Sequence, residues 1–575
     1  MYSHMSKHML LACVTIFGVF CSIGSSVSHH KSGTSDVYTS VLTSVVDGFH
    51  RANSLCDGTL NCFSTAALSA SATNEGFTFK EAMQQEDKHE FIKAMLLEIK
   101  SREDGGHWTM MKRKDVPAGT KTILSIWAFK RKRFPSGELN KHKARICAHG
   151  GMQTWGQNYW ETYAPVVNWA SVRLLLTIAK IHKLPSKSID FVLAFTQVDL
   201  EVPVYMEIPA GFMPEDDERQ RKYVLKLNKS LYGLKQGSYN WFEKLKRRLL
   251  DRGFKQSKVD PCVFMTSGTI GLTYVDDCII ISDKERKIDN LIKSLHKGDE
   301  NFKFTDEGSI DKYLGVDIHQ RDGGSFAMTQ PFLIDRILSL VGLNNGRTNS
   351  KLNPVGKPML NKDLDGVDRN YEWNYRSAIG ILTYLTGSVR PDIAMAVHQC
   401  ARFSNNPKRS HEQAVMRIAR YLLHTKDKGI ICTPKLKQGL EVYVDADFAG
   451  QWDPSQARDK DTMFSRTGFV IKYANCPVLW QSKLQTEISL STAEAEYIAL
   501  SSALRETIPL HNFLLELKND IPVKDCNPHF IVKVHEDNQS CIAIAENPKF
   551  TPRTKHIALK YHHFRNHVRT KNNRE

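Results

Sequence analysis

One short stretch, Gly271–Ser282 (GLTYVDDCIIIS), constrains the fold more than any other part of the chain. Two β-prone apolar runs flank the adjacent acids Asp276 and Asp277, a pattern that predicts a strand–turn–strand hairpin with both acids at its tip. Neighbouring carboxylates repel each other, and burying them is costly unless a cation neutralises them. Hard divalent cations such as Mg²⁺ bind carboxylates and phosphates. The stretch therefore indicates a metal–phosphate site, with a solvated Asp-Asp turn as the alternative.

Length, charge and cysteine usage set the broad class of protein. The chain has 575 residues, which is enough for several domains. Its 78 Lys and Arg exceed its 62 Asp and Glu, giving a net charge of +16 that favours a polyanionic partner such as nucleic acid. The 12 cysteines show no Cys-x-x-Cys pair and no Cys/His zinc spacing, which indicates a reduced intracellular protein.

The N-terminal segment fits this class poorly. The apolar run Met9–Gly24 follows Lys7 and resembles a signal peptide, although it is short for a membrane span. The alternative interpretation is a relic of upstream sequence in a truncated reading frame. Residues 25–78 are rich in Ser and Thr without firm periodicity, so we expect residues 1–78 to be poorly ordered. Because nothing later in the chain is typical of a secreted protein, secretory targeting is the less favoured hypothesis.

Hydrophobic periodicity predicts the elements of the first half of the chain. Asp190 is the single charge inside an apolar run, so it lies at a strand edge or is held by a metal. The expected elements are a helix at Phe79–Ile99, a basic hairpin with strands Ile123–Phe134 and Lys141–Ala148 joined by Pro135-Ser136-Gly137, a helix at Trp169–His182, strands at Lys187–Phe195 and Tyr223–Leu227, a helix ending near Leu250, a helix at Lys284–His296 and a strand at Asp311–His319.

The second half begins with a segment rich in Asn, Gly, Pro and Lys at residues 343–370, which predicts a linker. Helices are then expected at Tyr375–Ser388, Pro391–Phe403 and His411–His424. A second α/β unit is expected from about Gly429 to the end, with strands at Leu440–Val444, Thr467–Tyr473, Val478–Ser482 and Phe530–His535, a long helix at Thr492–Leu517, and two closing helices.

Ordered motifs add a family resemblance. Asp190-x-x-x-Ala194-Phe195, SLYGLKQ (Ser230–Gln236), YVDD (Tyr274–Asp277) and YLG (Tyr313–Gly315) resemble the reverse transcriptase of copia-type LTR retrotransposons. Flanking phrases agree, among them WAFKRKRFPSGELNKHKARICAHG, NYWETYAPVV, VYMEIPAGF and YRSAIGILTYLTGSVRPDIAMAV. The resemblance covers roughly residues 85–570. No protease signature, zinc knuckle or integrase zinc site is seen, so the chain is not expected to be the full polyprotein.

The resemblance implies an α+β right-hand polymerase with fingers, palm and thumb, followed by an α/β RNase H-like domain. We divide the chain into the segment 1–78, fingers and palm at 79–342, a linker and helical thumb or connection at 343–428, and the RNase H-like domain at 429–575. The implied activity is RNA-directed DNA polymerase, with two Mg²⁺ per active site and Mn²⁺ as an alternative. The implied partners are an RNA template, a DNA primer, an RNA–DNA hybrid and dNTPs.

The resemblance also implies a location in cytoplasmic virus-like particles or in the nucleus, without stable membrane association. Whether the chain forms a homodimer stays open.

The resemblance assigns roles to residues of the polymerase. Three acids would hold the metals: Asp190, Asp276 and Asp277. Phe195 matches an aromatic steric gate that excludes the ribose 2′-hydroxyl, and a plain core phenylalanine is the alternative. Lys143 and Arg145 match the basic strand that grips the triphosphate, with Lys130 as a further candidate. The remaining matches are Tyr232, Gly233 and Gln236 in the motif around the nucleotide and template, and Tyr313, Leu314 and Gly315 in the primer grip.

The C-terminal unit resembles an RNase H domain, whose two metals would be held by Asp445, Glu496 and Asp537. The phrases that carry this resemblance include VYVDADFAG, STAEAEYIAL, VHEDNQS and RTKHIALKYHHFR. Asp447 and Glu494 are near neighbours that could be confused with these acids. The chain has Ala558 where the family usually has an aspartate, so a fourth carboxylate is missing and the domain is either active or a structural remnant.

Two hypotheses from different classes follow. The first is an RNA-directed DNA polymerase with an RNase H domain. The second is a decayed or co-opted remnant that binds nucleic acid through its basic surface without synthesis. The chain departs from the usual family text at Phe191-Val192-Leu193 and Gly237-Ser238-Tyr239. Neither departure touches a carboxylate, and all three palm acids are present, which favours the first hypothesis.

Overall fold

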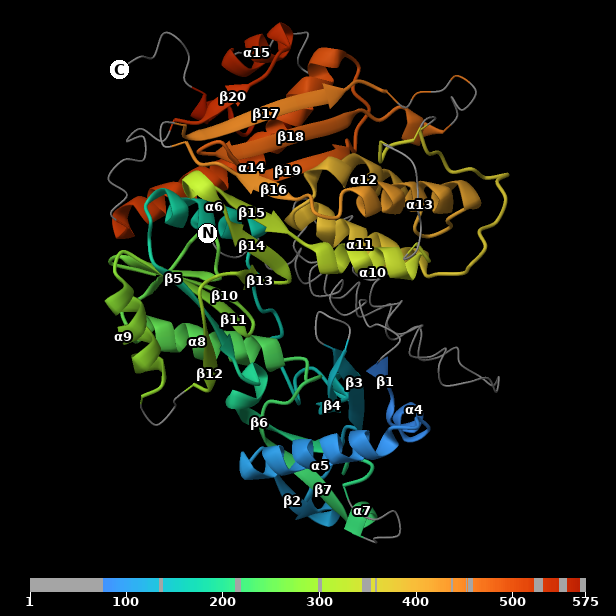
Figure 1. The fold of residues 1–575 in the computed structure, drawn as a ribbon, viewed down its shortest axis with the longest axis vertical. Coiled ribbons are helices and arrows are strands. Elements are labelled where there is room, and N and C mark those ends of the chain that lie inside the picture. Colours follow the sequence, from blue (N-terminus) through green and yellow to red (C-terminus); the bar gives the residue numbers. More distant parts are fainter. Residues whose placement is uncertain are drawn as a thin grey trace. The chain divides into compact units, whose positions relative to one another are not determined.

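The computed structural model describes residues 76–575 apart from short gaps, at 134–137, 213–218, 298–301, 344–352, 357–358, 436–437, 451, 453, 455–458, 522–530, 548–555 and 569–575. Residues 72–575 form one compact unit. Helices and strands alternate throughout this unit, which is mixed α+β (Figure 1). The interpretations of residues 1–75, including the apolar run at 9–24, lie outside the described residues. The division at 342/343 and 428/429 stays a prediction.

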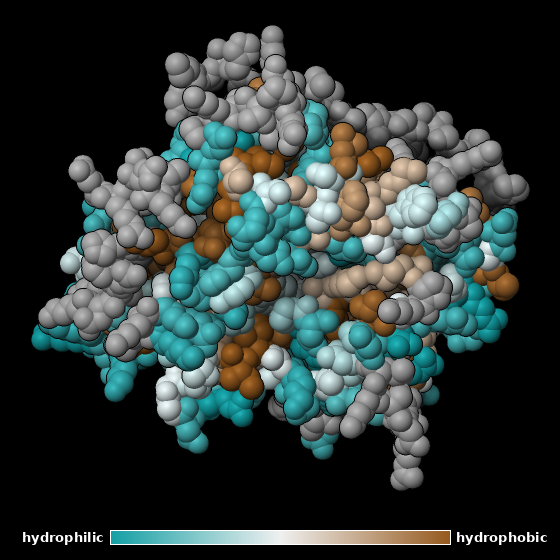
Figure 2. Space-filling view, turned by 90° about the horizontal axis from the view of Figure 1, so that it is seen from above, coloured by the Kyte–Doolittle hydropathy of each residue, from teal (hydrophilic) through white to brown (hydrophobic). Residues whose placement is uncertain are grey.

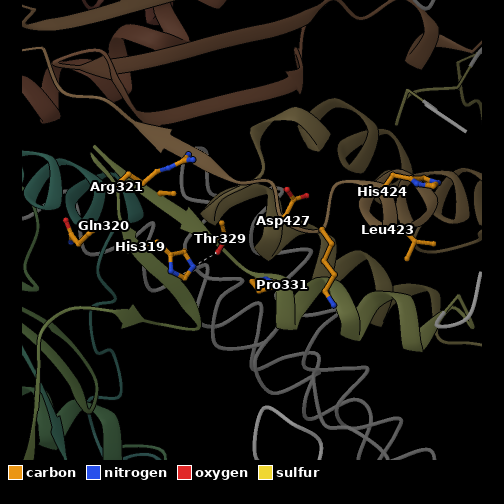
Figure 3. A pocket seen from close by; sticks show the side chains of 10 residues that line it. His319, Gln320, Arg321, Thr329, Pro331, Leu423, His424 and Asp427 are labelled. Atoms are coloured by element: carbon orange, nitrogen blue, oxygen red, sulfur yellow. Dashed lines mark hydrogen bonds between the residues drawn. The ribbon is translucent and has the colours of Figure 1, made fainter. Parts of the chain in front are cut away.

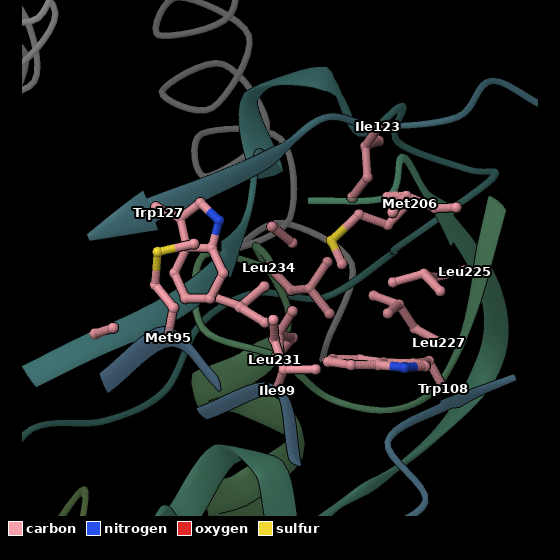
Figure 4. Packing of buried hydrophobic residues seen from close by; sticks show 14 of the residues in the cluster. Met95, Ile99, Trp108, Ile123, Trp127, Met206, Leu225, Leu227, Leu231 and Leu234 are labelled. Atoms are coloured by element: carbon pink, nitrogen blue, oxygen red, sulfur yellow. The ribbon is translucent and has the colours of Figure 1, made fainter. Parts of the chain in front are cut away.

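Two small sheets and a long helix form the first part. One sheet has the order β1-β3-β4 and the other β2-β7-β6, both antiparallel. Their shared core contains Trp108, Trp127, Met206 and Leu225 (Figure 4). The bounds are β1 Gly76–Phe77, α4 Phe79–Met83, α5 Lys88–Asp104, β2 Trp108–Lys112, η2 Arg113–Asp115, β3 Ser125–Arg133, β4 Leu139–Ala148, η3 Gly150–Met152, β6 Asp199–Met206, α7 Arg219–Lys222 and β7 Tyr223–Lys229.

The predicted basic hairpin is confirmed as β3 and β4, with its turn residues 135–137 outside the described part. The single helix predicted at 79–99 is wrong, because α4 ends at Met83 and α5 begins at Lys88. Between them, the carboxylate of Asp87 pairs with Arg131 and His142, each at 2.6 Å. These contacts with the hairpin hold the backbone near Asp87 in place, so the helix is interrupted between α4 and α5.

A six-stranded antiparallel sheet follows, with the order β12-β5-β11-β10-β9-β8. Its aromatic core is built around Phe191, which contacts Trp241, Phe302 and Phe304 edge to face. The bounds are α6 Trp169–Ile181, β5 Ser186–Phe191, η4 Ala194–Gln197, α8 Gly237–Leu250, β8 Lys255–Gln256, β9 Val263–Thr266, β10 Thr269–Tyr274, β11 Asp277–Ser282, α9 Glu285–Leu295 and β12 Phe304–Gly308.

Two strand predictions need correction. The strand expected at 187–195 ends at Phe191, because Leu193 adopts a left-handed conformation (φ 55°) that starts the 3₁₀ helix η4. The strand expected at 311–319 is a hairpin of β13 (Lys312–Tyr313) and β14 (Val316–Gln320). Leu314 and Gly315 turn the chain there with φ of 49° and 75°, a conformation that glycine adopts without strain.

The hairpin belongs to a third sheet, β13-β14-β15-β16. The four helices α10 to α13 of this part pack against one another. The expected helix at 375–388 is confirmed as α11, and the other two begin within three residues of their predicted starts. The helix α10 was not predicted. The bounds are η5 Asp322–Gly324, β15 Phe326–Thr329, α10 Pro331–Leu340, α11 Tyr375–Ser388, η6 Pro391–Ile393, α12 Ala394–Ala401, α13 Arg409–His424 and β16 Ile430–Cys432.

The last part is a sheet of order β19-β18-β17-β20 with the 29-residue helix α14 against it (Figure 1). The pair β17–β20 is parallel and the other pairs are antiparallel. In place of the second closing helix that we predicted, α15 is followed by the short 3₁₀ helices η9 and η10. The bounds are β17 Leu440–Asp447, η8 Lys460–Thr462, β18 Arg466–Tyr473, β19 Cys476–Leu484, α14 Thr492–Asp520, β20 Lys533–His535, α15 Gln539–Glu546, η9 Leu559–His562 and η10 Arg565–His567.

Arg173 on α6 joins three of these parts. Its side chain is only 2% exposed. Nε donates to the Val478 carbonyl of β19 at 2.8 Å, and one terminal nitrogen donates to the carbonyls of Gly387 and Ser388 on α11 at 2.9 Å each. The guanidinium also lies 4.2 Å from the Trp480 ring centroid. One buried cation therefore satisfies carbonyls from two other elements.

Among the described residues, no helix is both long and apolar enough to cross a bilayer. On the face that Figure 2 shows, hydrophobic areas alternate with hydrophilic ones.

Replacing Arg173 should destabilise the whole unit. Arg173→Met keeps much of the side-chain volume but leaves three carbonyls, two of them on buried residues, without this donor. We expect the free energy of unfolding to fall by about 3 kcal/mol or more, since an unsatisfied buried group costs ~1–3 kcal/mol. Urea unfolding followed by tryptophan fluorescence measures this. Arg286→Met, at an exposed arginine of α9, is the matched control. Equal unfolding free energies of the two variants would contradict this account of Arg173.

Candidate metal centres

The first cluster of acids is assembled by strand register. In the pairing of β5 with β11, Asp190 stands directly opposite Asp277. Asp276 lies in the turn between β10 and β11, where Tyr274 pairs with Asp277. The predicted hairpin with the two acids at its tip is thereby confirmed, and Asp190 lies on the neighbouring strand β5.

Buried hydrogen bonds hold the tip of this hairpin in place. Val275 has φ of 55°, a left-handed conformation that a β-branched residue rarely adopts. Its carbonyl accepts a 2.6 Å hydrogen bond from the indole nitrogen of buried Trp241. The Asp276 carbonyl accepts another from the Phe191 N–H at 2.8 Å. The backbone thus places Asp276 beside Asp190 and Asp277 independently of any charge attraction.

The electrostatics of the trio favour a cation. Burial raises the pKa of Asp190, Asp276 and Asp277 above the ordinary range, and that of Asp277 reaches about 7. Repulsion from the Asp276 charge raises the pKa of the other two further. Glu307 at the end of β12, which sequence reasoning missed, acts in the same direction. Oxygen donors that repel each other suit a hard divalent cation.

Basic side chains of the β3–β4 hairpin face this trio. Lys143 is paired in register with Lys130, and Lys132 with Lys141, so these cations share one face of the hairpin. Burial and then the charge of Arg145 lower the pKa of Lys143 to about 8. The charges of Lys132 and Lys143 in turn offset part of the rise in the pKa of Asp190. Lys132 was not among the predicted residues, although the alternation of the strand contains the signal.

Arg145 and Tyr232 line the space between the hairpin and the acids. The Arg145 guanidinium lies 4.8 Å from the Tyr232 ring centroid, and Arg145 Nε is buried without a hydrogen-bond partner. The Phe195 ring on η4 packs edge to face against the same tyrosine at 5.3 Å. Three predicted residues are thereby brought together, whereas Phe195 is on a helix rather than the predicted strand.

Gly233 and Gln236 both make close contacts within the protein. Gly233 has φ of 90°, and a Cβ there would lie 2.2 Å from the Ala148 carbonyl oxygen, so only glycine fits. Gln236 is 6% exposed, accepts from Gln153 Nε2 and donates to the Asn158 carbonyl, each at 3.0 Å. Both residues therefore position the loop next to Tyr232 through the protein's own contacts.

The predicted primer-grip residues form the β13–β14 turn. Leu314 accepts a hydrogen bond from the Tyr384 hydroxyl at 2.7 Å, and the Gly315 carbonyl accepts one from Gln330 at 3.3 Å. Tyr313 is buried, and its hydroxyl has no hydrogen-bond partner. The turn is thus fixed to the helical part of the chain.

The second cluster lies at the edge of the C-terminal sheet. The parallel register pairs Tyr443 with His535, and Asp445 and Asp537 stand two residues further along each strand direction. Carboxylate oxygens of Glu496, Glu536 and Asp537 lie within 4.8 Å of one another. Burial, followed by the charges of Glu536 and Asp445, raises the pKa of Glu496 to about 7. The structure brings the predicted Glu496 and Asp537 together and adds Glu536, which the sequence analysis missed. The predicted Asp445 is exposed and lies near enough for its charge to act on Glu496.

Of the two neighbouring acids, Glu494 is engaged elsewhere. Glu494 accepts a hydrogen bond from the Leu490 N–H at 2.8 Å and pairs with His556 at 3.3 Å. Asp447 is exposed and stands opposite Arg466 in the sheet. Ala558 precedes η9 and offers no polar side chain. Of the candidate acids on α14, Glu496 is thus the one directed at the cluster.

The two clusters differ in spacing. Within the described ranges, side-chain ligand atoms of three acids approach within 4.8 Å of one another at the C-terminal cluster alone. Asp190, Asp276 and Asp277 are brought together by strand register and are partly buried, but their carboxylate oxygens do not all lie within 4.8 Å of one another.

A separate recess of about 610 Å³ lies where β14 and β15 face the end of α13 (Figure 3). None of the predicted site residues lines it. Several of its side chains are basic, namely His319, Arg321, His424 and Lys426, beside the acidic Asp427. Lys426 pairs with Asp335 at 2.5 Å, so part of this charge is compensated.

Comparison with known proteins gives a consistent result for the first part of the chain. The reverse transcriptase (RNA-dependent DNA polymerase) family matches residues 107–357. The retrovirus-related Pol polyprotein from transposon TNT 1-94 of Nicotiana tabacum is 33% identical over 521 residues, which cover 88% of this chain and 37% of that protein. The corresponding polyprotein from transposon RE1 of Arabidopsis thaliana is 31% identical over 514 residues, covering 88% and 33%. The chain therefore spans about a third of the length of these relatives.

Among solved structures, similarity is found to the foamy viral protease-reverse transcriptase dRH in complex with ds DNA. The TM-score is 0.36 at 11% identity, covering 79% of this chain and 64% of that chain. The fold described above rests on this chain's own sheets and not on that likeness.

The raised pKa of Asp277 predicts a pH-dependent stability. Its pKa moves from an ordinary 3.8 to about 7 on folding, so the native state binds more protons between these values. The contribution of Asp277 to stability is fully present below its unfolded pKa of 3.8 and is lost as pH rises through its folded pKa of about 7. In EDTA, unfolding free energy should therefore fall more steeply for the wild type than for Asp277→Asn between about pH 5 and about pH 8.

Thermal unfolding across pH measures this difference, and added Mg²⁺ should raise Tm more at the alkaline end. Asp289→Asn is the control, because a hydrogen bond from Lys187 lowers the pKa of Asp289. Asp289 therefore titrates below this pH window, and its replacement should leave the slope between about pH 5 and about pH 8 unchanged. Parallel pH profiles for the wild type and Asp277→Asn would refute the assignment.

Proposed function

Because the chain belongs to the Pol polyproteins of copia-type retrotransposons and residues 107–357 carry their reverse transcriptase domain, we propose that it is an RNA-directed DNA polymerase. It would extend a DNA primer along an RNA template with dNTPs. One observation carries the proposal beyond the family: the register that sets Asp190 opposite Asp277, with Asp276 beside them. Three acids from two separate motifs share a single place.

The donor set fits two divalent metals. The trio offers only carboxylate oxygens, whose mutual repulsion a cation relieves, and oxygen ligands are those that Mg²⁺ prefers. Asp190, Asp276 and Asp277 would hold the ions, with Mg²⁺ expected and Mn²⁺ as the alternative. Bound there, the metals supply activation of the primer 3′-hydroxyl and neutralisation of the departing pyrophosphate.

The chain's own residues would orient the substrates. The cationic face of β4, with Lys143 and Arg145, lies where a triphosphate must approach the three acids, and phosphate binding favours clustered cations. Tyr232 and Phe195 form an aromatic wall beside it. The Tyr313–Gly315 turn, fixed by Tyr384 and Gln330, would support the primer strand. The net charge of +16 favours the nucleic-acid partner in general.

We further propose that residues 429–575 are the RNase H-like domain of the same polyprotein. The strand order β19-β18-β17-β20 with one parallel pair, and acids at the ends of β17, β20 and the start of α14, support this. Two metals there would promote hydrolysis of the RNA strand of a hybrid.

A second candidate function is nucleic-acid binding without synthesis, by a decayed or co-opted copy. Ala558, in place of the family's usual aspartate, favours it. Under this hypothesis the basic surface is retained and the chemistry is lost, so binding and catalysis separate in an assay.

Primer extension tests the polymerase. Purified full-length chain with Mg²⁺ on poly(rA)/oligo(dT) is expected to extend the primer. An Asp276→Asn/Asp277→Asn double variant should lose at least about 10³-fold in rate, since aligned metals supply several kcal/mol to the transition state and 1.36 kcal/mol is tenfold.

Asp289→Asn, an exposed acid on α9, serves as the matched control and should retain activity. Hybrid binding at low salt is measured in parallel. Binding without extension by the wild type would reject the polymerase and leave the binding remnant.

Phe195 provides a test of substrate selection. Its ring packs against Tyr232, and removal should open space for a ribose 2′-hydroxyl. Phe195→Ala is expected to raise the ratio of rNTP to dNTP incorporation by about tenfold or more, equivalent to ~1.4 kcal/mol of lost exclusion. Phe302→Leu, in the sheet core, is the control that perturbs packing alone. An unchanged ratio would make Phe195 a plain packing residue.

A further inference from the structure

The C-terminal cluster contains an acid to which the motif comparison gives no role. Glu536 follows β20 directly and precedes Asp537, and its carboxylate lies within 4.8 Å of ligand atoms of both Glu496 and Asp537. A group of acids alone does not make a metal site, because acids often cluster at surfaces. The environment of each oxygen decides whether a cation belongs there.

Glu496 supplies that independent observation. Its side chain is 4% exposed, and Oε2 is buried without any hydrogen-bond partner. A buried carboxylate oxygen left without a donor costs a large part of its hydration. Glu496 contributes one carboxylate oxygen to the cluster, so a cation bound among the acids would satisfy this buried carboxylate.

Glu536 is held so that one oxygen remains available. Oε1 accepts a 3.1 Å hydrogen bond from the Asn538 N–H, whereas Oε2 is buried without a hydrogen-bond partner. The thiol of Cys541, a weak donor, interacts with the same carboxylate. Asn538 itself caps α15 through Cys541 N–H at 2.9 Å. The helix cap therefore fixes the orientation of the Glu536 carboxylate.

Position 558 cannot take part. Ala558 has no oxygen in its side chain, and the segment around it is fixed to α14 by His556 on Glu494 and by His562 on the Tyr497 hydroxyl at 2.8 Å. The remaining acids, Asp445, Glu496 and Asp537, carry three negative charges. Glu536 brings the total to four, which equals the charge of two divalent cations and leaves no net charge to bury.

We propose that Glu536 is a divalent-cation ligand of the C-terminal cluster, in the place of the acid that is missing at Ala558. The chemistry is that of a hard cation among carboxylates, Mg²⁺ or Mn²⁺. The inference rests on the proposed RNase H-like role for its purpose, but cation binding itself can be measured without any catalysis.

The test measures Mn²⁺ binding by electron paramagnetic resonance on the full chain. All variants carry Asp276→Asn/Asp277→Asn, so that the C-terminal cluster is observed by itself. Glu536→Gln is expected to weaken Mn²⁺ binding by about tenfold or more, the range seen when groups around a metal are lost. Glu546→Gln, an exposed glutamate on α15, is the matched control and should bind as the parent does. Equal affinity of Glu536→Gln and the parent would overturn the proposal.

A second variant decides the case even if Glu536→Gln fails to fold. Ala558→Asp should change the affinity by less than about threefold if Glu536 already supplies the fourth charge, because a further acid then exceeds the charge of two cations. A tenfold gain would show an unfilled position and reject Glu536. In the Glu536→Gln/Ala558→Asp double variant, recovery of binding is expected.

Polymerase failure would be seen separately, as absence of primer extension by the chain with intact Asp276 and Asp277. Hydrolysis of a labelled RNA–DNA hybrid then reports whether the bound metal serves cleavage. Neither assay alters the outcome of the Mn²⁺ titration.

Discussion

The antiparallel pairing of β5 with β11 is the constraint on which the rest of the site depends. Side chains alternate along a strand, so a slip by one residue would turn Asp190 to the opposite face and away from Asp277. Buried apolar residues on both strands keep this register. They are Ile189 on β5 and Ile279, Ile280 and Ile281 on β11. Packing of the hydrophobic core therefore positions the carboxylates, and the carboxylates do not stabilise that core. Phe191 shows this division most clearly, since it anchors the aromatic core one residue after Asp190.

Both acidic clusters are held against their own repulsion by neutral contacts. At the first, Trp241 binds the carbonyl of a strained Val275. At the second, the long helix α14 and the cap of α15 fix Glu496 and Glu536. In each case the backbone geometry is determined by packing and hydrogen bonds some distance from the carboxylates. If the two clusters bind cations as proposed, this arrangement reduces the reorganisation needed on binding.

The sequence was most informative where a pattern and a chemical signal coincided. The Asp276–Asp277 hairpin, the basic β3–β4 hairpin and the long α14 were predicted because alternation or helical spacing extends over many residues. Short turns inside apolar runs were missed. Leu193 and Leu314 adopt left-handed conformations, which a leucine in the sequence does not indicate. Only Gly315, next to Leu314, indicated a turn in the sequence. Glu536 was missed because it forms its group only after β20 is placed beside β17. Residues that become neighbours only through parallel strand pairing cannot be predicted from their spacing in the sequence. The roles of all these residues stay predictions.

Arg173 has a consequence for substrates longer than either site. Its guanidinium couples the helix before β5 to α11 and to β19, so the two acidic clusters belong to a scaffold clamped at a buried point. A duplex that touches both clusters at once must then match a span set by the protein. If one duplex binds at both clusters as proposed, the number of base pairs between the two contacts is set by the protein and does not depend on the nucleotide sequence.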